Sequence, residues 1–386
     1  MAPRSTAWNS SILIGVALCL LAPGPATGQL NQQRGRSGDS STPSPTGSVS
    51  TAKATTAPAS RPEFPWPYGR VTGPIECQAD TQWSYYLYLP NSLPAGELWP
   101  VMFVMSPSGG TASTLDRYLP GAEFVGMVLV CSVQARNDFA PGREAIEAMV
   151  KDAIKRLPLD PAMFYASGYS GGARRATTLA AGQCTKPFTG VLHCAGAAGA
   201  GTLAQKTLKY GLCGSNCFNR WDMARFYERN SPFRSHLRFF IGNHDWAPVD
   251  LITDGMIWLY GNTLRRQASL PKTLPQRDRF VVKLTERIKA SQETQPADAY
   301  YWATFLTAFP ASPKLLTESQ TIARQLQANP TVVTFLAGEA DVEKYWQKHF
   351  AESGKSGTRD AERMATKYAG TPYEALFKRL GQDSPQ

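Results

Sequence analysis

Met163-Phe-Tyr-Ala-Ser-Gly-Tyr-Ser-Gly-Gly172 decides the fold, because an apolar, strand-like run passes here directly into the pattern Gly168-x-Ser170-x-Gly172. The residues that follow, 173–180, favour a helix. A serine between a buried parallel strand and a helix must lie on a sharp turn, and small residues on both sides keep the backbone clear while the hydroxyl projects above the sheet. The stretch is therefore typical of a nucleophile elbow with Ser170 at its apex.

Apolar runs alternate with helix-like stretches on both sides of this turn. Most of the runs are short and uninterrupted, as strands that are covered on both faces must be. This repetition predicts an α/β protein with a doubly wound, mostly parallel sheet, and it places the elbow at the carboxyl end of a strand, where such sheets bind ligands. The predicted strands are 83–89, 101–105, 126–131, 163–166, 190–194, 237–241 and 280–284.

The rest of the chain divides into three further segments. Residues 1–28 combine an early arginine, a short apolar run and Ala26-Thr-Gly28, which predicts a secretory signal peptide cleaved before Gln29 and a secreted or periplasmic protein. The apolar run is too short to give a stable membrane span. Residues 29–64 are rich in Ser, Thr and Pro, which predicts a disordered linker, and the α/β domain is expected over 65–290. Only helical patterns follow, which predicts a helical C-terminal extension over 291–386.

The charge and the cysteine content of the chain limit which partners and cofactors are expected. The formal net charge is +10, but the basic residues are scattered, so no nucleic-acid partner is expected. Six of the seven cysteines lie beyond the expected signal peptide, which favours some disulfides in an exported chain. Their pairing stays open, and no ligand spacing predicts a metal or another cofactor. These six are Cys77, Cys131, Cys184, Cys194, Cys213 and Cys217.

Three stretches within about residues 80–290 resemble the α/β-hydrolase family, in particular its secreted polyhydroxybutyrate-depolymerase and feruloyl-esterase-like branch. Tyr86-Leu-Tyr-Leu-Pro90 with 101–110 is similar to the strand pair that leads into the family's oxyanion loop. Residues 159–172 are similar to its Asp-Pro entry into the nucleophile strand, and Phe239-Phe-Ile-Gly-Asn-His-Asp-Trp246 to the turn that delivers its acid.

The resemblance implies roles for particular residues. Ser170 would be the nucleophile, and the backbone N–H groups of Gly171 and Ser108 would bind the oxyanion. Ser106 and Pro107 replace the family's usual His-Gly, and a proline has no N–H, so the oxyanion loop is expected to be reshaped. Asp245 would be the acid, with Asp250 as the nearby substitute. Trp246 and Tyr169 are expected to line the substrate cleft.

The base is the weak point of this interpretation. The family places it after the last strand, which is expected between residues 285 and 297, and that stretch has no histidine. Of the four histidines in the chain, His244 is the best candidate because it adjoins Asp245. His193 is expected to be a satisfied core residue, His236 a loop residue before a strand, and His349 an exposed helix position.

Two functions stay open on the sequence. The first, which the intact elbow favours, is a secreted serine hydrolase that cleaves carboxylic esters of a polymeric or plant-derived substrate. The second is a catalytically inactive protein of the same fold that serves as a binding or cell-envelope module. A His244 ring within hydrogen-bond reach of Ser170 would favour the enzyme. The particular ester and the oligomeric state are not indicated by the sequence.

Overall fold

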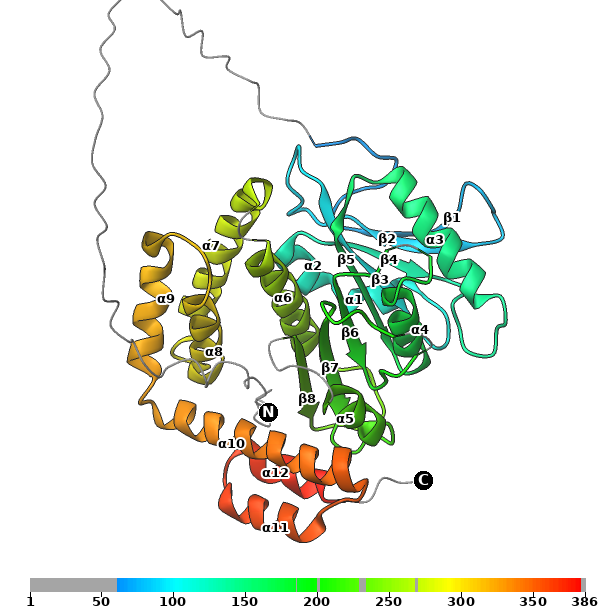
Figure 1. Ribbon diagram of the computed structural model, residues 1–386. Helices are drawn as coiled ribbons and strands as arrows, with labels where there is room; N and C mark the ends of the chain where they lie inside the picture. The colour runs from blue at the N-terminus through cyan, green and yellow to red at the C-terminus, as the bar shows by residue number, and fades with distance from the viewer. Residues whose placement is uncertain (1–60, 185, 200–201, 229–233, 268–269, 383–386) are drawn as a thin grey trace, which may run out of the picture.

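The computed structural model describes residues 61–184, 186–199, 202–228, 234–267 and 270–382 (Figure 1). The predicted signal peptide and nearly all of the predicted linker therefore lie outside the described residues. Within the described ranges, no helix combines the length and the apolar character that a membrane span requires.

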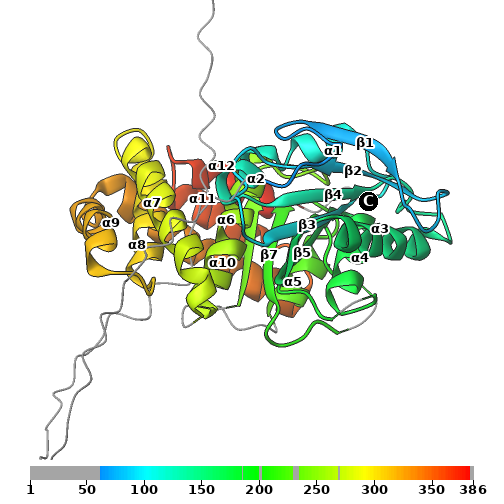
Figure 2. The same ribbon diagram turned by 90° about the horizontal axis from the view of Figure 1, so that it is seen from above.

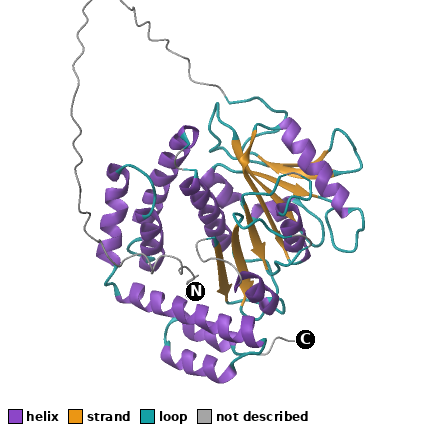
Figure 3. Cartoon of the chain, viewed as in Figure 1, coloured by secondary structure: helices purple, strands orange, loops and turns teal. Residues whose placement is uncertain are grey.

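One eight-stranded sheet forms the centre of the molecule, with the strand order β1-β2-β4-β3-β5-β6-β7-β8 (Figures 1 and 3). β1 pairs with β2 and β2 with β4 in antiparallel fashion, whereas the other neighbours are parallel. The predicted doubly wound, mostly parallel sheet is confirmed. The strands are β1 Val71–Glu76, β2 Ser84–Tyr88, β3 Trp99–Met105, β4 Val128–Ser132, β5 Leu159–Tyr169, β6 Gly190–Cys194, β7 Leu208–Gly214 and β8 Ser235–Phe240.

Helices cover both faces of the sheet, which explains why β3, β4, β6 and β7 are buried along their whole length. Apolar side chains of α3 (Gly142–Arg156) and α4 (Gly171–Ala180) form one core with the sheet. Those of α2 (Leu119–Val125) and α6 (Val249–Arg266) belong to the core on the other face. The short α1 (Ala112–Asp116) follows β3, and α5 (Arg220–Glu228) packs against β7 and β8.

The predicted strand 280–284 is wrong, because these residues lie within α7 (Leu274–Ser291). Phe280, Val281, Leu284 and Ile288 are buried at helical spacing while Val282 is exposed, as expected for one apolar face of a helix. Two strands were not predicted: β1, which is an edge strand with exposed residues, and β7. The last strand of the sheet is therefore β8, which ends at residue 240.

The C-terminal part is helical, as predicted, and its helices begin with α7, ahead of residue 291. In Figures 1 and 2, α7 to α9 lie beside α6, away from α3 and α4, and Figure 1 shows α10 to α12 beyond β8. The predicted boundary between the two parts stays a prediction. These helices are α8 Pro296–Thr307, α9 Pro313–Leu326, α10 Pro330–Trp346, the π-helix η2 Gln347–Ser353, α11 Thr358–Lys367 and α12 Pro372–Leu380, with a short 3-10 helix, η1 Pro271–Thr273, before α7.

Candidate active site

Ser170 occupies the sharp turn that the sequence predicts between β5 and α4. Its backbone has φ 52° and ψ −119°, a conformation that a residue with a side chain rarely adopts. The turn needs glycine on both sides, since a Cβ at Gly168 would lie 2.5 Å from the carbonyl carbon of Gly172, and one at Gly172 would lie 2.3 Å from the carbonyl oxygen of Met105. Strain held in this way by its surroundings is common at functional sites.

The ring of His244 lies within hydrogen-bond distance of this serine. Ser170 Oγ and His244 Nε2 are 2.8 Å apart, although the two residues are 74 positions apart in the sequence. His244 follows β8, the last strand, so the histidine does stand where the resemblance implies a base. The predicted position of the base between residues 285 and 297 is wrong because 280–284 belongs to helix α7 and is not the last strand. Phe218 stacks on the ring with a centroid distance of 3.9 Å.

The other ring nitrogen of His244 contacts a cysteine. Nδ1 lies 3.1 Å from Sγ of Cys217, a buried residue in the turn that follows β7. In the tautomer that accepts a proton from the serine at Nε2, the ring carries its own proton at Nδ1, and this N–H then donates to Cys217 Sγ. Ser170, His244 and Cys217 thus form a continuous chain of hydrogen-bonding groups.

Further donors surround the sulfur of Cys217. The backbone N–H of Asn219 donates to Cys217 Sγ at 3.4 Å, and the Cys213 thiol, at the end of β7, lies within hydrogen-bonding distance. The hydrogen bond from Cys213 and then that from His244 lower the pKa of the Cys217 thiol, against the effect of burial. Burial raises the pKa of Cys213, so Cys213 remains the protonated partner.

The structure does not bring the side chain of Asp245 to the His244 ring, where the expected acid would have to lie. Its side chain is exposed, and across the described part of the chain it makes no hydrogen bond or ion pair. The substitute, Asp250, is exposed in the first turn of α6. The side chain that does reach the second ring nitrogen, Cys217, precedes the histidine along the chain.

The sequence reasoning missed Cys217 because it did not recognise β7. Lys209, Gly211 and Gly214 interrupt the apolar run of that strand, so the turn that carries Cys217 was not placed at the sheet edge. Phe218 was missed for the same reason. With β7 recognised, this turn would have been placed at the sheet edge that carries Ser170.

Backbone donors for an oxyanion are expected beside Ser170. Gly171 is the first residue of α4, so its N–H is one of the helix amides without an acceptor inside the helix. Ser108 is exposed in the loop after β3, with its Oγ 3.3 Å from Ser106 Oγ. The backbone N–H of Asn137 donates to the Pro107 carbonyl oxygen at 2.7 Å. The oxyanion roles of Gly171 and Ser108 stay predictions.

Asn137 is a further side chain at the elbow that the sequence did not single out. A Cβ at Gly171 would lie only 2.0 Å from Asn137 Oδ1, so its carboxamide abuts the residue after the nucleophile. Nothing in the local sequence distinguishes this asparagine from other polar loop residues. It forms part of the wall around Ser170.

Two predicted substrate-binding residues support the loop that carries His244. The Tyr169 hydroxyl donates to the backbone carbonyl of His244 at 2.6 Å. The Tyr169 ring stacks on Trp246 at a centroid distance of 5.0 Å, and the Arg117 guanidinium lies 5.6 Å from the Trp246 ring centroid. These contacts fix the histidine loop, and substrate binding by Tyr169 and Trp246 stays a prediction.

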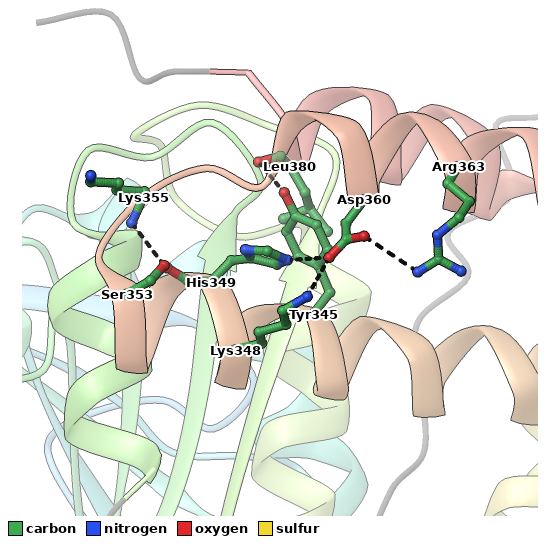
Figure 4. A network of polar contacts seen from close by, with 8 residues as sticks. All are labelled: Tyr345, Lys348, His349, Ser353, Lys355, Asp360, Arg363 and Leu380. Carbon is green, nitrogen blue, oxygen red and sulfur yellow. Dashed lines mark hydrogen bonds and ion pairs between the residues drawn. The ribbon is translucent and has the colours of Figure 1, made fainter.

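The other histidines have partners elsewhere. His193 is buried, 2.8 Å from Thr177 Oγ1 and 2.7 Å from the Tyr227 hydroxyl, and burial lowers its pKa to about 3. His349, in η2, lies 2.9 Å from a carboxylate oxygen of Asp360 (Figure 4). His193 is the satisfied core residue that the sequence predicts.

All six described cysteines are free thiols. Within the described ranges, no group of three or more His, Cys, Asp and Glu side chains could hold a metal ion.

Comparisons by sequence and by structure gave different results. No protein-family model matches the sequence, and no curated protein matches it. FphF, a fluorophosphonate-binding serine hydrolase of Staphylococcus aureus, is 16% identical, with a TM-score of 0.37, over 46% of this chain and 92% of its own. EstE1, a thermophilic carboxylesterase cloned from a metagenomic library, is 12% identical, with a TM-score of 0.40, over 51% of this chain and 90% of its own. An acetyl xylan esterase from Aspergillus awamori is 13% identical, with a TM-score of 0.36, over 47% of this chain and 95% of its own.

The architecture of the chain itself carries the assignment. The chain has an elbow serine after a central parallel strand and, later along the chain, a histidine after the last strand. This arrangement is typical of the α/β-hydrolase fold. The chain has the α/β-hydrolase fold.

Proposed function

We propose that this protein is a serine hydrolase that cleaves carboxylic esters with Ser170 as the nucleophile. The observation that carries the proposal is the 2.8 Å contact between Ser170 Oγ and His244 Nε2 at a strained strand-to-helix turn. A serine hydroxyl is a weak nucleophile unless a neighbouring base accepts its proton. His244 is placed to be such a base, because its Nε2 accepts from Ser170 Oγ when the ring proton is on Nδ1.

The reaction follows from this geometry in two balanced halves. Ser170 Oγ attacks the ester carbonyl carbon as its proton passes to His244 Nε2, and the carbonyl oxygen becomes an oxyanion. When the tetrahedral intermediate collapses, the ester C–O bond breaks and the leaving alcohol takes the proton from His244. Water then attacks the acyl group on Ser170 by the same route, which releases the carboxylic acid and restores the serine.

The elbow also offers stabilisation for the oxyanion. The N–H of Gly171 and the positive end of the α4 dipole are directed towards the region next to Ser170. A second donor is expected from the loop at Ser108. Preorganised donors of this kind are often the largest single contribution to rate.

The inactive-module alternative loses support from the same contact. A scaffold that only binds has no need of a base at hydrogen-bond distance from a strained serine. Carboxylic esters of polymeric or plant-derived material remain the proposed substrate class, and aromatic Tyr169, Phe218 and Trp246 near the ring suit such groups.

Labelling with a fluorophosphonate probe tests the proposal without knowledge of the natural ester. We expect a covalent adduct on Ser170, located by mass spectrometry, and hydrolysis of a p-nitrophenyl ester. Ser170→Ala should lose both, while Ser353→Ala, which removes a serine hydroxyl in η2, should retain both. Unchanged ester turnover in Ser170→Ala, or a folded wild-type protein without an adduct, would contradict the proposal.

We also propose that the protein is exported after cleavage before Gln29. The support is the n-region, the apolar run and the small-residue cleavage site in residues 1–28. Mass spectrometry of the protein secreted by an expressing cell should give an N-terminus at Gln29. Retention of the whole leader in the mature protein would contradict export by this route.

A further inference from the structure

The third member of the candidate triad is a sulfur atom where the resemblance implies a carboxylate. We propose that Cys217 acts as a thiolate that orients the His244 ring and stabilises its charged form, with Cys213 as the thiol donor that supports it. This inference rests on the proposed function of Ser170 and His244 and deepens it. Cys217 is a positioning residue, since it contacts the base and not the ester.

The hydrogen bonds at Cys217 require an acceptor. With the ring proton on Nδ1, His244 donates to Sγ at 3.1 Å, and the Asn219 backbone N–H donates to the same atom at 3.4 Å. The Cys213 thiol is the third group at this sulfur. A thiolate accepts all three, whereas a thiol at Cys217 would add a proton to a site where donors already converge.

The surroundings of the sulfur favour the negative charge over its neutral form. Cys213 and Cys217 are both buried, which by itself disfavours a charge, so the hydrogen-bond donors at the sulfur have to offset the loss of water. The guanidinium of Arg220, also buried, donates to the Ser215 carbonyl oxygen at 2.7 Å in the same turn and adds a positive charge nearby. The hydrogen bonds from Cys213, His244 and Asn219 lower the pKa of Cys217, most strongly through Cys213, against the effect of burial.

The thiolate has a defined part in the proposed reaction. Nδ1–H stays on the ring throughout, so Nε2 remains free to accept the Ser170 proton. The ring becomes positively charged when it takes this proton, and the adjacent thiolate stabilises that charge. Cys217 itself gains and loses no proton.

Variants of the thiol pair test this role, with a p-nitrophenyl ester assayed in excess reductant. Cys217→Ser keeps the size of the side chain and removes the charge, so we expect kcat to fall by about 10²- to 10⁴-fold with little change in KM. Cys217→Asp restores an anion and should be faster than Cys217→Ala. Cys184→Ser, at a partly buried thiol outside the site, is the matched control and should match the wild type.

Thiolate absorption in the ultraviolet is the readout that a merely structural cysteine would not move. We expect the band in the wild type and in Cys184→Ser, a weaker band in Cys213→Ala, and no band in Cys217→Ser. Absence of the band in the wild type, or a kcat of Cys217→Ser equal to that of the wild type, would overturn the proposal. So would folded Cys217→Asp and Cys217→Ala variants with equal rates.

Two competing arrangements give distinct outcomes. Loss of activity in Asp245→Asn with retention in Cys217→Ser would assign the role to Asp245. A Cys213–Cys217 disulfide, found by mass spectrometry in the fully active enzyme, would exclude a thiolate. Either result overturns the role of Cys217 and leaves the proposed function standing, because that function is contradicted by unchanged turnover in Ser170→Ala or by a folded wild type without a probe adduct, and neither is implied here.

Discussion

The contact between Ser170 and His244 is stronger support for a catalytic site than the elbow motif is by itself. The elbow pattern indicates a serine in a strained turn, but glycines and serines also occur together by chance. The 2.8 Å contact with Nε2 adds a candidate base, Phe218 stacks on its ring, and the Tyr169 hydroxyl donates to its backbone carbonyl. A nucleophilic serine and its histidine base act as a unit, so we expect either residue alone to contribute almost nothing to kcat.

Removal of the base tests this unit. We expect His244→Ala to lower kcat on a p-nitrophenyl ester by as much as Ser170→Ala, on the order of 10⁶-fold. The double variant should be no slower than either single variant, because the nucleophile and the base act together in the same step. His349→Ala, which removes a histidine paired with Asp360 in the helical part, should keep wild-type turnover (Figure 4). Additive losses in the double variant would contradict a shared role.

At the scale of elements, the site is assembled at one edge of the sheet. β5, β6, β7 and β8 are successive parallel neighbours, so their carboxyl ends lie at the same edge. Ser170 follows β5, Cys217 follows β7 and His244 follows β8. Rigid strand ends hold the groups more precisely than free loops could, which suits a nucleophile and base that must stay within hydrogen-bond reach.

The close approach of α4 to β3 gives a test at this scale. A Cβ at Gly172 would lie 2.3 Å from the carbonyl oxygen of Met105, which is backbone and cannot swing aside. We expect Gly172→Ala to move the start of α4 away from β3, to lower the free energy of unfolding by about 1 to 3 kcal/mol, and to reduce kcat. Urea unfolding and the ester assay measure the two effects.

Gly370→Ala separates the effect at the site from the general cost of replacing a glycine. Gly370 has φ +77°, and a Cβ there would meet nothing within 4 Å. Its replacement should cost about 1 to 2 kcal/mol of stability through the backbone alone and leave kcat unchanged. Equal kcat in Gly172→Ala and the wild type would show that the elbow tolerates a wider turn.

At the scale of the whole molecule, a buried ion-pair network ties the helical part to the sheet. Asp254 of α6 accepts from Arg238 of β8 at 3.4 Å and from Arg287 of α7 at 2.6 Å. Asp254 and Arg238 are almost fully buried, so each charge depends on its partner. Arg287 also lies 3.5 Å from Asp298 of α8, which extends the network further into the helices.

Breaking this network should destabilise the fold strongly. We expect Asp254→Ala to lower the free energy of unfolding by about 3 to 5 kcal/mol, because two arginines lose a shared buried partner. Asp360→Ala removes an aspartate that also has several partners, Lys348, His349 and Arg363 (Figure 4), but Asp360 is only half-buried and its two cationic partners, Lys348 and Arg363, are exposed. It should cost less than about 1 kcal/mol. Similar losses in the two variants, measured by urea unfolding, would contradict the importance of burial.

Local patterns predicted the parts of this fold that depend on local physics. Uninterrupted apolar runs gave six of the eight strands, among them β6 over its whole length, because strands covered on both faces must be apolar throughout. The run at 280–284 was misread, since a short apolar segment does not distinguish a strand from a buried helix face. β7 was not predicted because glycines and Lys209 interrupt its apolar run.

The α/β class, the turn at Ser170 and the helical nature of the C-terminal part follow from local sequence, since periodicity and small residues act over a few positions. Three features appear only in the folded molecule: β8 is the last strand, His244 contacts Ser170, and Cys217 rather than Asp245 contacts Nδ1. Cys217 and His244 are 27 positions apart, and their contact depends on which strands are neighbours in the sheet. That order is fixed by packing across the whole molecule, so no local pattern encodes it.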